Sequence, residues 1–369
     1  MAHVRKQMIS LFMTTKCNLR CTYCYVYKDK SIKKEHQTLD FNFAKRGISD
    51  FFRDNPSRHI RFYGAGEPTL EFDLMKKIRN FAFEKAGKAL TVELQTNGFF
   101  SEKVAEWISK NVNILWISSD GPAEVQNLQR PTIGNKPTSE IVEKNIKYFV
   151  KYNKSMQVGI RATVTPLMMK RQIEIVKYFH NLGIKYVNVL PTFASIMENP
   201  DDIFKWKSLD FAKNYLLAHN EAKKLGLFYN TMFIANFDEP TRYGCRSCIP
   251  CPHLTTDGYV SCCDFTQFGP EYSPGPLQQL IYGKYNPKKD LIVYDEKAIC
   301  RVRQRCAENL QEQKCRGCKY VYNCAGGCLG QVVNETGDVM GRVERNCVIV
   351  QYLAKRMERN KGLHPVLHS

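Results

Sequence analysis

The chain has 369 residues, of which 43% are hydrophobic, 24% charged and 12% aromatic, a composition that is typical of a globular protein and excludes a disordered chain. No apolar stretch approaches the roughly 20 residues that a membrane-spanning helix needs, and the N-terminus lacks a cleavable export signal, so we predict a cytoplasmic protein without a membrane partner. The formal net charge of +18 suits an acidic partner, but a lysine-rich solvated surface explains it equally well.

Apolar runs of strand length alternate with amphipathic stretches of helix length in the first half of the chain. The runs are Gln7–Met13, His59–Tyr63, Thr91–Gln95, Ile114–Ser118, Val158–Val164 and Lys185–Leu190. The helical stretches lie at 40–54, 70–87, 102–110, 139–152 and 167–182. Because a parallel return needs a long crossover, these repeats predict an α/β fold, a partial (β/α)6 barrel of the TIM type, with its chemistry at the carboxyl ends of the strands.

Short motifs follow the first four predicted strands, directly where each strand ends. They are the cysteines Cys17, Cys21 and Cys24, then GAGEP (64–68), TNG (96–98) and SDGP (119–122). Since the carboxyl ends of parallel strands meet at one edge of a sheet, we expect these motifs to lie close together.

The fifteen cysteines fall into two groups, because none lies between Cys24 and Cys245. Their grouped spacing in a chain without an export signal favours metal ligation over disulfides. The long gap also predicts domain boundaries. We expect the barrel at 1–195, a bridging segment of helix and strand at 196–240, a cysteine-rich domain at 241–350 and a C-terminal helix or tail at 351–369.

The first cysteine group has the spacing C-x3-C-x2-C with Tyr23 before its third member, and together with GAGEP it resembles the radical S-adenosylmethionine superfamily. In that family three thiolates hold three irons of a [4Fe–4S] cluster. The fourth iron binds S-adenosylmethionine, whose one-electron cleavage releases a 5′-deoxyadenosyl radical that abstracts hydrogen from a substrate. The resemblance implies Cys17, Cys21 and Cys24 as cluster ligands.

The same resemblance implies residues that contact S-adenosylmethionine, namely Tyr23, Gly64, Ala65, Gly66, Glu67, Asn97, Ser119 and Arg161. Family members usually have glycine at the position of Ala65, and alanine fits there only if the residue keeps a negative φ. Caps or turns remain alternative roles for Asn97 and Ser119, as does an ordinary ion pair for Arg161.

The second cysteine group resembles the SPASM extension, which binds two auxiliary [4Fe–4S] clusters. Its pattern is C-x2-C-x5-C-x3-C-x18-C from Cys315 to Cys347, preceded by a predicted hairpin with its turn at Asp257-Gly258. The resemblance implies a distal cluster on Cys315, Cys318, Cys324 and Cys347, and a proximal cluster on Cys245, Cys248, Cys263 and Cys328. The fourth proximal ligand stays open between Cys245, Cys251, Cys262 and a free iron site, while Cys300 and Cys306 are expected to be free thiols.

Asp264 follows Cys263 in a CDF triplet that also occurs in anaerobic sulfatase-maturing enzymes, where this aspartate is the base for the substrate side chain. A carboxylate removed from bulk water can have the raised pKa that suits a general base, and we expect this for Asp264. A turn aspartate that accepts hydrogen bonds from backbone amides is the alternative.

The resemblance implies a peptide or protein substrate that receives a thioether or carbon–carbon crosslink or is oxidised. Formylglycine formation of the sulfatase-maturing type is the alternative. The expected partners are an electron donor such as flavodoxin or ferredoxin and, because only six residues precede the first predicted strand, a separate leader-recognition protein. A zinc-ribbon protein that binds nucleic acid would fit the charge and the C-x2-C pairs but not the strand-end motifs, so we expect no nucleic-acid partner.

Overall fold

A computed structural model describes residues 7–28, 36–152, 155–193, 205–234, 237, 240–272 and 275–357. The predicted segments 196–240 and 351–369 are covered only in part, because residues 194–204, 235–236, 238–239 and 358–369 lie outside the described residues. In the described part of the chain, no helix combines the length and the apolar character that crossing a bilayer requires.

A curved sheet organises the described residues, and its parallel strands are neighbours in chain order. These strands are β1 (Ile9–Phe12), β2 (His59–Tyr63), β3 (Thr91–Thr96), β4 (Ile114–Ser118), β5 (Gln157–Val164), β6 (Tyr186–Pro191) and β7 (Phe228–Asn230). The C-terminal region extends the other edge with β8 (His253–Leu254), β9 (Tyr259–Ser261), β10 (Ile281–Asn286) and β11 (Leu291–Tyr294). Strand β8 pairs parallel with β1, and the remaining three pairs are antiparallel.

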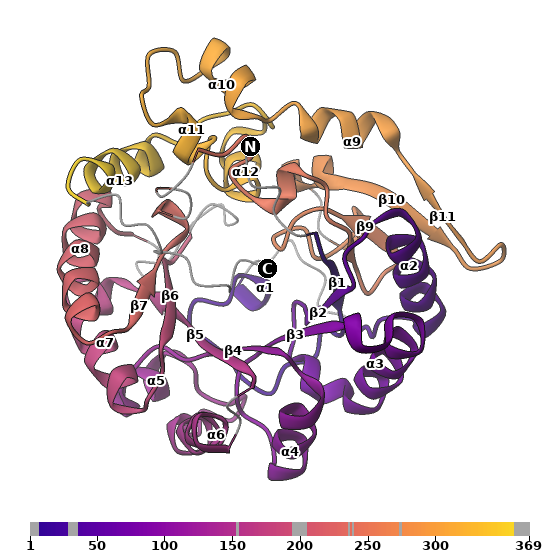
Figure 1. Ribbon diagram of the computed structural model, residues 1–369, viewed down its shortest axis with the longest axis horizontal. Helices are drawn as coiled ribbons and strands as arrows, with labels where there is room; N and C mark the ends of the chain where they lie inside the picture. The colour runs from indigo at the N-terminus through magenta and orange to yellow at the C-terminus, as the bar shows by residue number, and fades with distance from the viewer. Residues whose placement is uncertain are drawn as a thin grey trace.

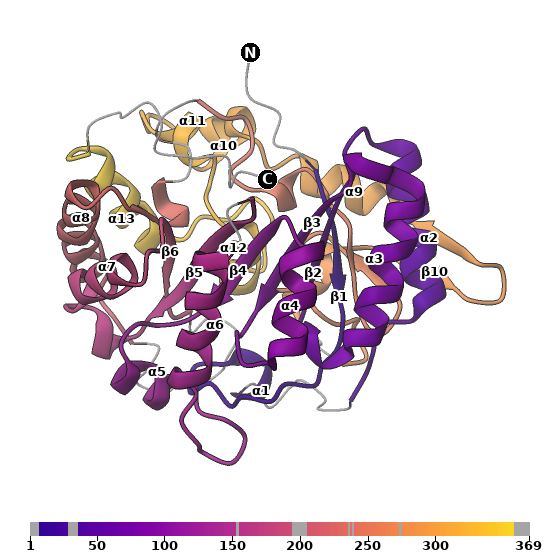
Figure 2. The same cartoon turned by 60° about the horizontal axis from the view of Figure 1, so that its bottom comes forward.

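Helices line the outer side of the parallel strands, as Figures 1 and 2 show. They are α2 (Phe41–Asp54), α3 (Phe72–Ala86), α4 (Glu102–Asn111), α5 (Ala123–Gln129), α6 (Ser139–Tyr152), α7 (Gln172–Asn181) and α8 (Ser208–Lys224). The short α1 (Tyr25–Lys28) lies inside the ring in Figure 1. The C-terminal helices are α9 (Glu296–Arg303), α10 (Ala307–Gln313), α11 (Val321–Cys324), α12 (Leu329–Thr336) and α13 (Glu344–Ala354).

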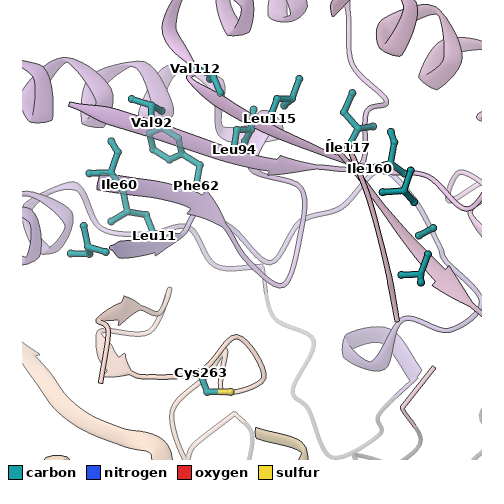
Figure 3. Close-up of a cluster of buried hydrophobic side chains, with 14 of the residues drawn as sticks. Leu11, Ile60, Phe62, Val92, Leu94, Val112, Leu115, Ile117, Ile160 and Cys263 are labelled. Carbon is teal, nitrogen blue, oxygen red and sulfur yellow. The ribbon is translucent and has the colours of Figure 1, made fainter. Parts of the chain in front are cut away.

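The alternation of side chains along the strands separates an apolar outer face from a polar inner face. On β2, Ile60 and Phe62 are fully buried in the hydrophobic core, whereas Arg61 and Tyr63 face the interior of the ring. In Figure 3, Leu11, Phe62, Leu94 and Ile117 are among the apolar side chains that neighbouring strands contribute to this core. The core therefore sits between sheet and helices and leaves the inner face for polar groups.

The predicted α/β fold with a parallel sheet is confirmed, and each of the six predicted strands and five predicted helices has its counterpart. Two features differ from the expectation of six strands and a separate cysteine-rich region. Strand β7, which follows α8, adds a seventh parallel strand next to β6. The hairpin of β8 and β9, with the predicted turn at Asp257-Gly258, covers the edge of β1, whose backbone groups would otherwise lack partners.

Candidate active site

A cavity of about 620 Å³ is enclosed by the inner face of the parallel strands. The loop with the first three cysteines, the turn at 64–67 and alternate residues of β2 to β7 line it, together with C-terminal segments around Cys245, Cys263 and Cys328. The two cysteine groups, which are far apart in the sequence, therefore meet in one space.

The loop that carries the cysteine triplet is held by backbone hydrogen bonds to the segment after α5. Arg20 N donates to Pro131 O over 2.8 Å, and Thr22 N donates to Gln129 O over 2.9 Å. These contacts hold the backbone on both sides of Cys21. The position of the Cys21 thiol is therefore set by the barrel segment at Gln129 and Pro131.

The three thiols of the triplet lie close enough for the charge of each to affect the pKa of another. Burial raises the pKa of the Cys17 thiol to about 11 and that of the Cys21 thiol to about 12. Thiols with such pKa values are neutral at pH 7 in the absence of a cation that binds the thiolate form.

The turn after β2 packs directly on the cysteine loop. Gly66 N donates to Thr14 O (2.9 Å) and Glu67 N donates to Lys16 O (2.7 Å). A Cβ atom at Gly66 would lie 2.0 Å from Lys16 O, so the close approach of the two backbones requires glycine there. Ala65 keeps a negative φ, which meets the condition on which alanine fits this turn.

We predict that Gly66→Ala lowers the free energy of unfolding by about 1–3 kcal/mol or more, because the added methyl group clashes with backbone that cannot rotate away. Gly134→Ala is the matched control, since a Cβ atom there meets nothing within 4 Å. Urea denaturation of both variants measures the effect. Equal stability of the two variants would contradict the close packing of the turn on the loop.

The Glu67 side chain, 2% exposed, is saturated with donors from the protein itself. Its Oε1 accepts from the hydroxyls of Thr69 and Thr96, each over 2.7 Å, and its Oε2 accepts from Asn97 N over 2.7 Å. Burial raises the pKa of Glu67, and these hydrogen bonds oppose the shift. Glu67 therefore joins the turns after β2 and β3.

Asn97 points toward the cysteine loop. Its Nδ2 donates to Asn18 Oδ1 over 2.7 Å and lies 3.9 Å from Cys17 Sγ, while its Oδ1 accepts from Phe99 N. The hydrogen bond from Phe99 N agrees with the predicted turn role of Asn97, and the predicted contact with S-adenosylmethionine stays a prediction for a residue that lines the cavity.

Tyr23 belongs to a hydrogen-bond network that the sequence did not predict. Its hydroxyl donates to Asp120 Oδ2 over 2.7 Å and accepts from Arg130. Asp120 also accepts from Gln129 Nε2 and Thr163 N, each over 2.9 Å. Arg130 lines the cavity, and its charge lowers the pKa of Cys21 against the larger effect of burial. The network therefore places a fixed cation beside the triplet.

Two predicted contacts have different surroundings: Ser119 directly follows β4, whereas Arg161 lies within β5 and not at its end as expected. Ser119 is buried, its hydroxyl contacts Gln126 Oε1 over 3.4 Å, and it does not line the cavity, whereas Ser118 does. The reason is strand alternation, which turns Trp116 and Ser118 inward. Arg161 lines the cavity with its guanidinium 5.4 Å from the Trp116 ring, and no ion pair joins it to a described carboxylate.

Further polar side chains of the inner face were missed by the sequence analysis. They are Arg61, Glu93, Gln95, Thr163, Asn188 and Asn230. A signal was present, because polar residues occupy alternate positions within strands whose other positions are apolar. Glu93 is buried beside His59 at 3.1 Å, and although burial raises its pKa, His59 and Arg61 hold that pKa at about 2.

Asp264 lies at the cavity wall, bound to the inner face of the barrel. Arg61 donates to both of its carboxylate oxygens, and His253 Nε2 lies 3.0 Å from its Oδ1. The expectation of a raised pKa is wrong: burial acts in that direction, but Arg61 and His253 outweigh it and hold the pKa well below the usual range of aspartate. Asp264 is an ionised carboxylate held by the guanidinium of Arg61.

Several C-terminal cysteines lie near one another. In the predicted proximal set, Cys245 Sγ is 3.8 Å from Cys248 Sγ, and charge interactions link Cys263 to Cys328 and Cys328 to Cys245. In the predicted distal set, charge interactions link the four thiols of Cys315, Cys318, Cys324 and Cys347. Cys324 and Cys328, at the two ends of one tight turn, belong to different predicted sets.

The remaining thiols differ in exposure. Cys251 and Cys262 are buried close to Cys245, so the choice of a fourth proximal ligand stays open between them. Cys300 is exposed, and Cys306 is buried. Within the described residues, no three cysteine, histidine or carboxylate side chains converge enough to hold one metal ion.

Comparison with known proteins agrees with this arrangement. Residues 11–169 match the Radical SAM superfamily. An uncharacterized protein of Methanocaldococcus jannaschii is 31% identical over 180 residues, which are 48% of this chain and 60% of that protein. A tungsten-containing aldehyde ferredoxin oxidoreductase cofactor-modifying protein of Pyrococcus furiosus is 28% identical over 240 residues, 62% of this chain and 65% of that protein. The chain thus spans less than two thirds of these two relatives.

A longer match reaches the cysteine-type anaerobic sulfatase-maturating enzyme of Clostridium perfringens, 24% identical over 339 residues and 85% of each chain. Among solved structures, native anSMEcpe with bound AdoMet has a TM-score of 0.74 at 20% identity over 95% of this chain and 98% of that one. Streptococcus suis SuiB bound to precursor peptide SuiA has a TM-score of 0.64 at 17% identity, over 92% of this chain and 75% of that one. The barrel-like fold is shared, and residues 11–169 of this chain form a domain of the Radical SAM superfamily.

Proposed function

We propose that this chain is an enzyme that abstracts a hydrogen atom from a side chain of a peptide or protein. The substrate radical then loses one electron to an iron–sulfur cluster and one proton to a base, and so forms a thioether or carbon–carbon crosslink or an oxidised residue. One observation supports this above all others. The cysteine triplet, Asp264 and the thiols of Cys245, Cys263 and Cys328 line the same cavity, so a side chain held there would reach both cysteine groups.

Cys17, Cys21 and Cys24 are the proposed ligands of a [4Fe–4S] cluster with S-adenosylmethionine at its fourth iron. The bound pair supplies a one-electron cleavage that yields a 5′-deoxyadenosyl radical. The turn at 64–67 borders this place, Arg161 offers a positive charge without a described carboxylate partner, and Tyr23 is fixed by Asp120 and Arg130. The enclosing strands limit the access of water to the reacting groups.

Asp264 is the proposed acceptor of a proton from the substrate side chain. It is already ionised, because Arg61 and His253 stabilise its negative charge. The same contacts make it a weak base, so a substrate group that approaches must compete with Arg61 for the carboxylate before the proton moves.

The C-terminal sets are proposed to hold the two auxiliary [4Fe–4S] clusters, giving three in all, within a cysteine-rich domain at 241–350. Electrons come from a flavodoxin or ferredoxin, and a separate protein or the barrel mouth recognises the leader of the substrate. Two proteins of similar fold have been solved with peptides bound, anSMEcpe with Cp18Cys and SuiB with SuiA, and both support a peptide substrate.

The test is a cleavage assay on protein reconstituted with iron and sulfide without air. We expect about twelve irons per chain, as for three [4Fe–4S] clusters, and reductant-dependent formation of 5′-deoxyadenosine. Peptides encoded by small open reading frames beside the gene are then screened by mass spectrometry for loss of hydrogen. Zinc in place of iron together with an absence of cleavage would refute the proposal.

Formylglycine formation is the second candidate, favoured by the CDF triplet at 263–265 and by the 24% identity to a sulfatase-maturating enzyme over 339 residues. Incubation of the enzyme with a peptide that carries a cysteine or serine in a sulfatase sequence distinguishes formylglycine formation from the first candidate function. Conversion to formylglycine would establish this reaction, and modification of only the neighbouring-gene peptide would exclude it.

A further inference from the structure

Arg305 is a fully buried side chain whose charge has no carboxylate partner among the described residues. It is 0% exposed, and no ion pair joins it to an acidic residue of the described chain. An unpaired charge in a protein interior is strongly unfavourable unless an opposite charge lies nearby. Among the described residues, only backbone carbonyl groups and the nearby cysteine thiols compensate the charge of this guanidinium.

The guanidinium ties together the two segments that lead to the predicted cluster ligands. Its Nη1 donates to Val339 O over 2.6 Å and to Gly341 O over 3.0 Å, and its Nη2 donates to Gly326 O over 2.5 Å. Gly326 lies in the turn between Cys324 and Cys328, and Gly341 precedes Cys347. The Nε atom has no hydrogen-bond partner among the described residues.

The charge of Arg305 acts on thiols of both cysteine sets. Burial raises the pKa of Cys315, Cys324 and Cys328, and in each case the charge of Arg305 acts in the opposite direction. A hydrogen bond with Cys245 and burial raise the pKa of Cys248, again against Arg305. Arg305 is therefore close enough to thiols of both sets for its charge to act on them, and its hydrogen bond to Gly326 O fixes it at the turn that joins Cys324 to Cys328.

The turn beside Arg305 leaves space for the guanidinium because residue 326 is a glycine. A Cβ atom at Gly326, where φ is +77°, would lie 2.4 Å from Arg305 Nη2. At Gly327, where φ is +71°, a Cβ atom would meet nothing within 4 Å. Alanine at either position has a similar backbone strain, but only alanine at 326 would displace the guanidinium.

We propose that Arg305 is the internal counter-cation and positioning residue of the two C-terminal cysteine sets, and that the anionic iron–sulfur clusters they hold neutralise it. This rests on the proposed function, because the clusters are part of it. Each [4Fe–4S] cluster with four thiolates carries about −2 and gains one further negative charge when an external donor reduces it by one electron. A buried cation beside such clusters stabilises the reduced form and raises their reduction potential.

The experiment uses the full chain with Cys17, Cys21 and Cys24 replaced by alanine, so that only the C-terminal clusters are observed. This parent should retain about eight irons after anaerobic reconstitution, as for two clusters. If it retains none, the proposed cofactor set is wrong independently of Arg305. Arg305→Met and Arg305→Lys are then compared with the parent by iron content and by dithionite titration followed by electron paramagnetic resonance.

We expect Arg305→Met to shift the midpoint potential to more negative values or to lose iron, and Arg305→Lys, which keeps the charge, to stay closer to the parent in both readouts. Gly326→Ala should likewise shift the potential or lose iron relative to Gly327→Ala. Equal behaviour of the methionine and lysine variants would overturn the role of the charge, because a role in packing alone does not depend on it. Equal behaviour of the two glycine variants would overturn the positioning role, because a Cβ atom at Gly326 meets Arg305 Nη2 and Leu310 Cδ1 whereas one at Gly327 meets nothing within 4 Å.

Discussion

Replacement of Cys17, Cys21 and Cys24 by alanine is expected to reduce cleavage of S-adenosylmethionine to the rate without enzyme. The physical reason is that the protein positions and shields the reaction, whereas the cluster supplies the electron chemistry. Iron content should fall from about twelve to about eight per chain, because the two C-terminal clusters are held by other thiolates. Product analysis for 5′-deoxyadenosine and an iron assay measure both effects on the same sample.

Cys300→Ala is the matched control for this experiment. Cys300 is exposed and belongs to neither cysteine set, so its removal should change neither iron content nor cleavage. A triple variant that cleaves as fast as the unmodified protein would refute the assignment of the triplet. A triple variant that has lost all iron would show that the C-terminal sets do not hold clusters on their own.

Much of the barrel could be predicted because its strands are apolar runs separated by helices of full length. The run at His59–Tyr63 has the same bounds in the structure. Strand β7 was missed because it has three residues and is defined by its pairing with β6, in which Tyr186 lies opposite Phe228. Apolar patterning cannot reveal so short a strand, whose existence depends on a neighbour distant in the sequence.

The candidate site was predictable where it follows from motifs and not where it follows from long-range contacts. The triplet and the turn at 64–67 were identified from their spacing, and both line the cavity. The direction in which the pKa of Asp264 shifts could not be predicted, because its partner Arg61 lies 203 positions earlier in the chain. Successive side chains of a strand point to opposite faces, so Ser118 faces the cavity and Ser119 does not. Sequence patterns place a strand end only to within one or two residues, which is too coarse to choose between these two serines.

Asp264→Asn is expected to lower the rate of substrate modification by about 100-fold or more, the usual contribution of a general base. Cleavage of S-adenosylmethionine without substrate should continue, because Asp264 is not part of the cysteine triplet. Mass spectrometry of the peptide and assay of 5′-deoxyadenosine separate the two activities. Asp257→Asn is the control, since Asp257 lies in the turn of the preceding hairpin and instead accepts hydrogen bonds from the Thr255 hydroxyl and Gly269 N. Equal modification rates in both variants would contradict the role of Asp264.

The same variant has a second readout in the pH dependence of stability. The pKa of Asp264 is below its unfolded value, so its contact with Arg61 stabilises the folded state fully above about pH 4, the ordinary pKa of aspartate, and this contribution declines as pH falls. At pH 7 we expect Asp264→Asn to cost about 2 kcal/mol, less than for a fully enclosed pair because the side chain is 32% exposed. Urea denaturation from pH 7 downward should show the difference from the unmodified protein shrinking below pH 4. A constant difference across this range would mean that Arg61 does not hold Asp264 in its ionised form.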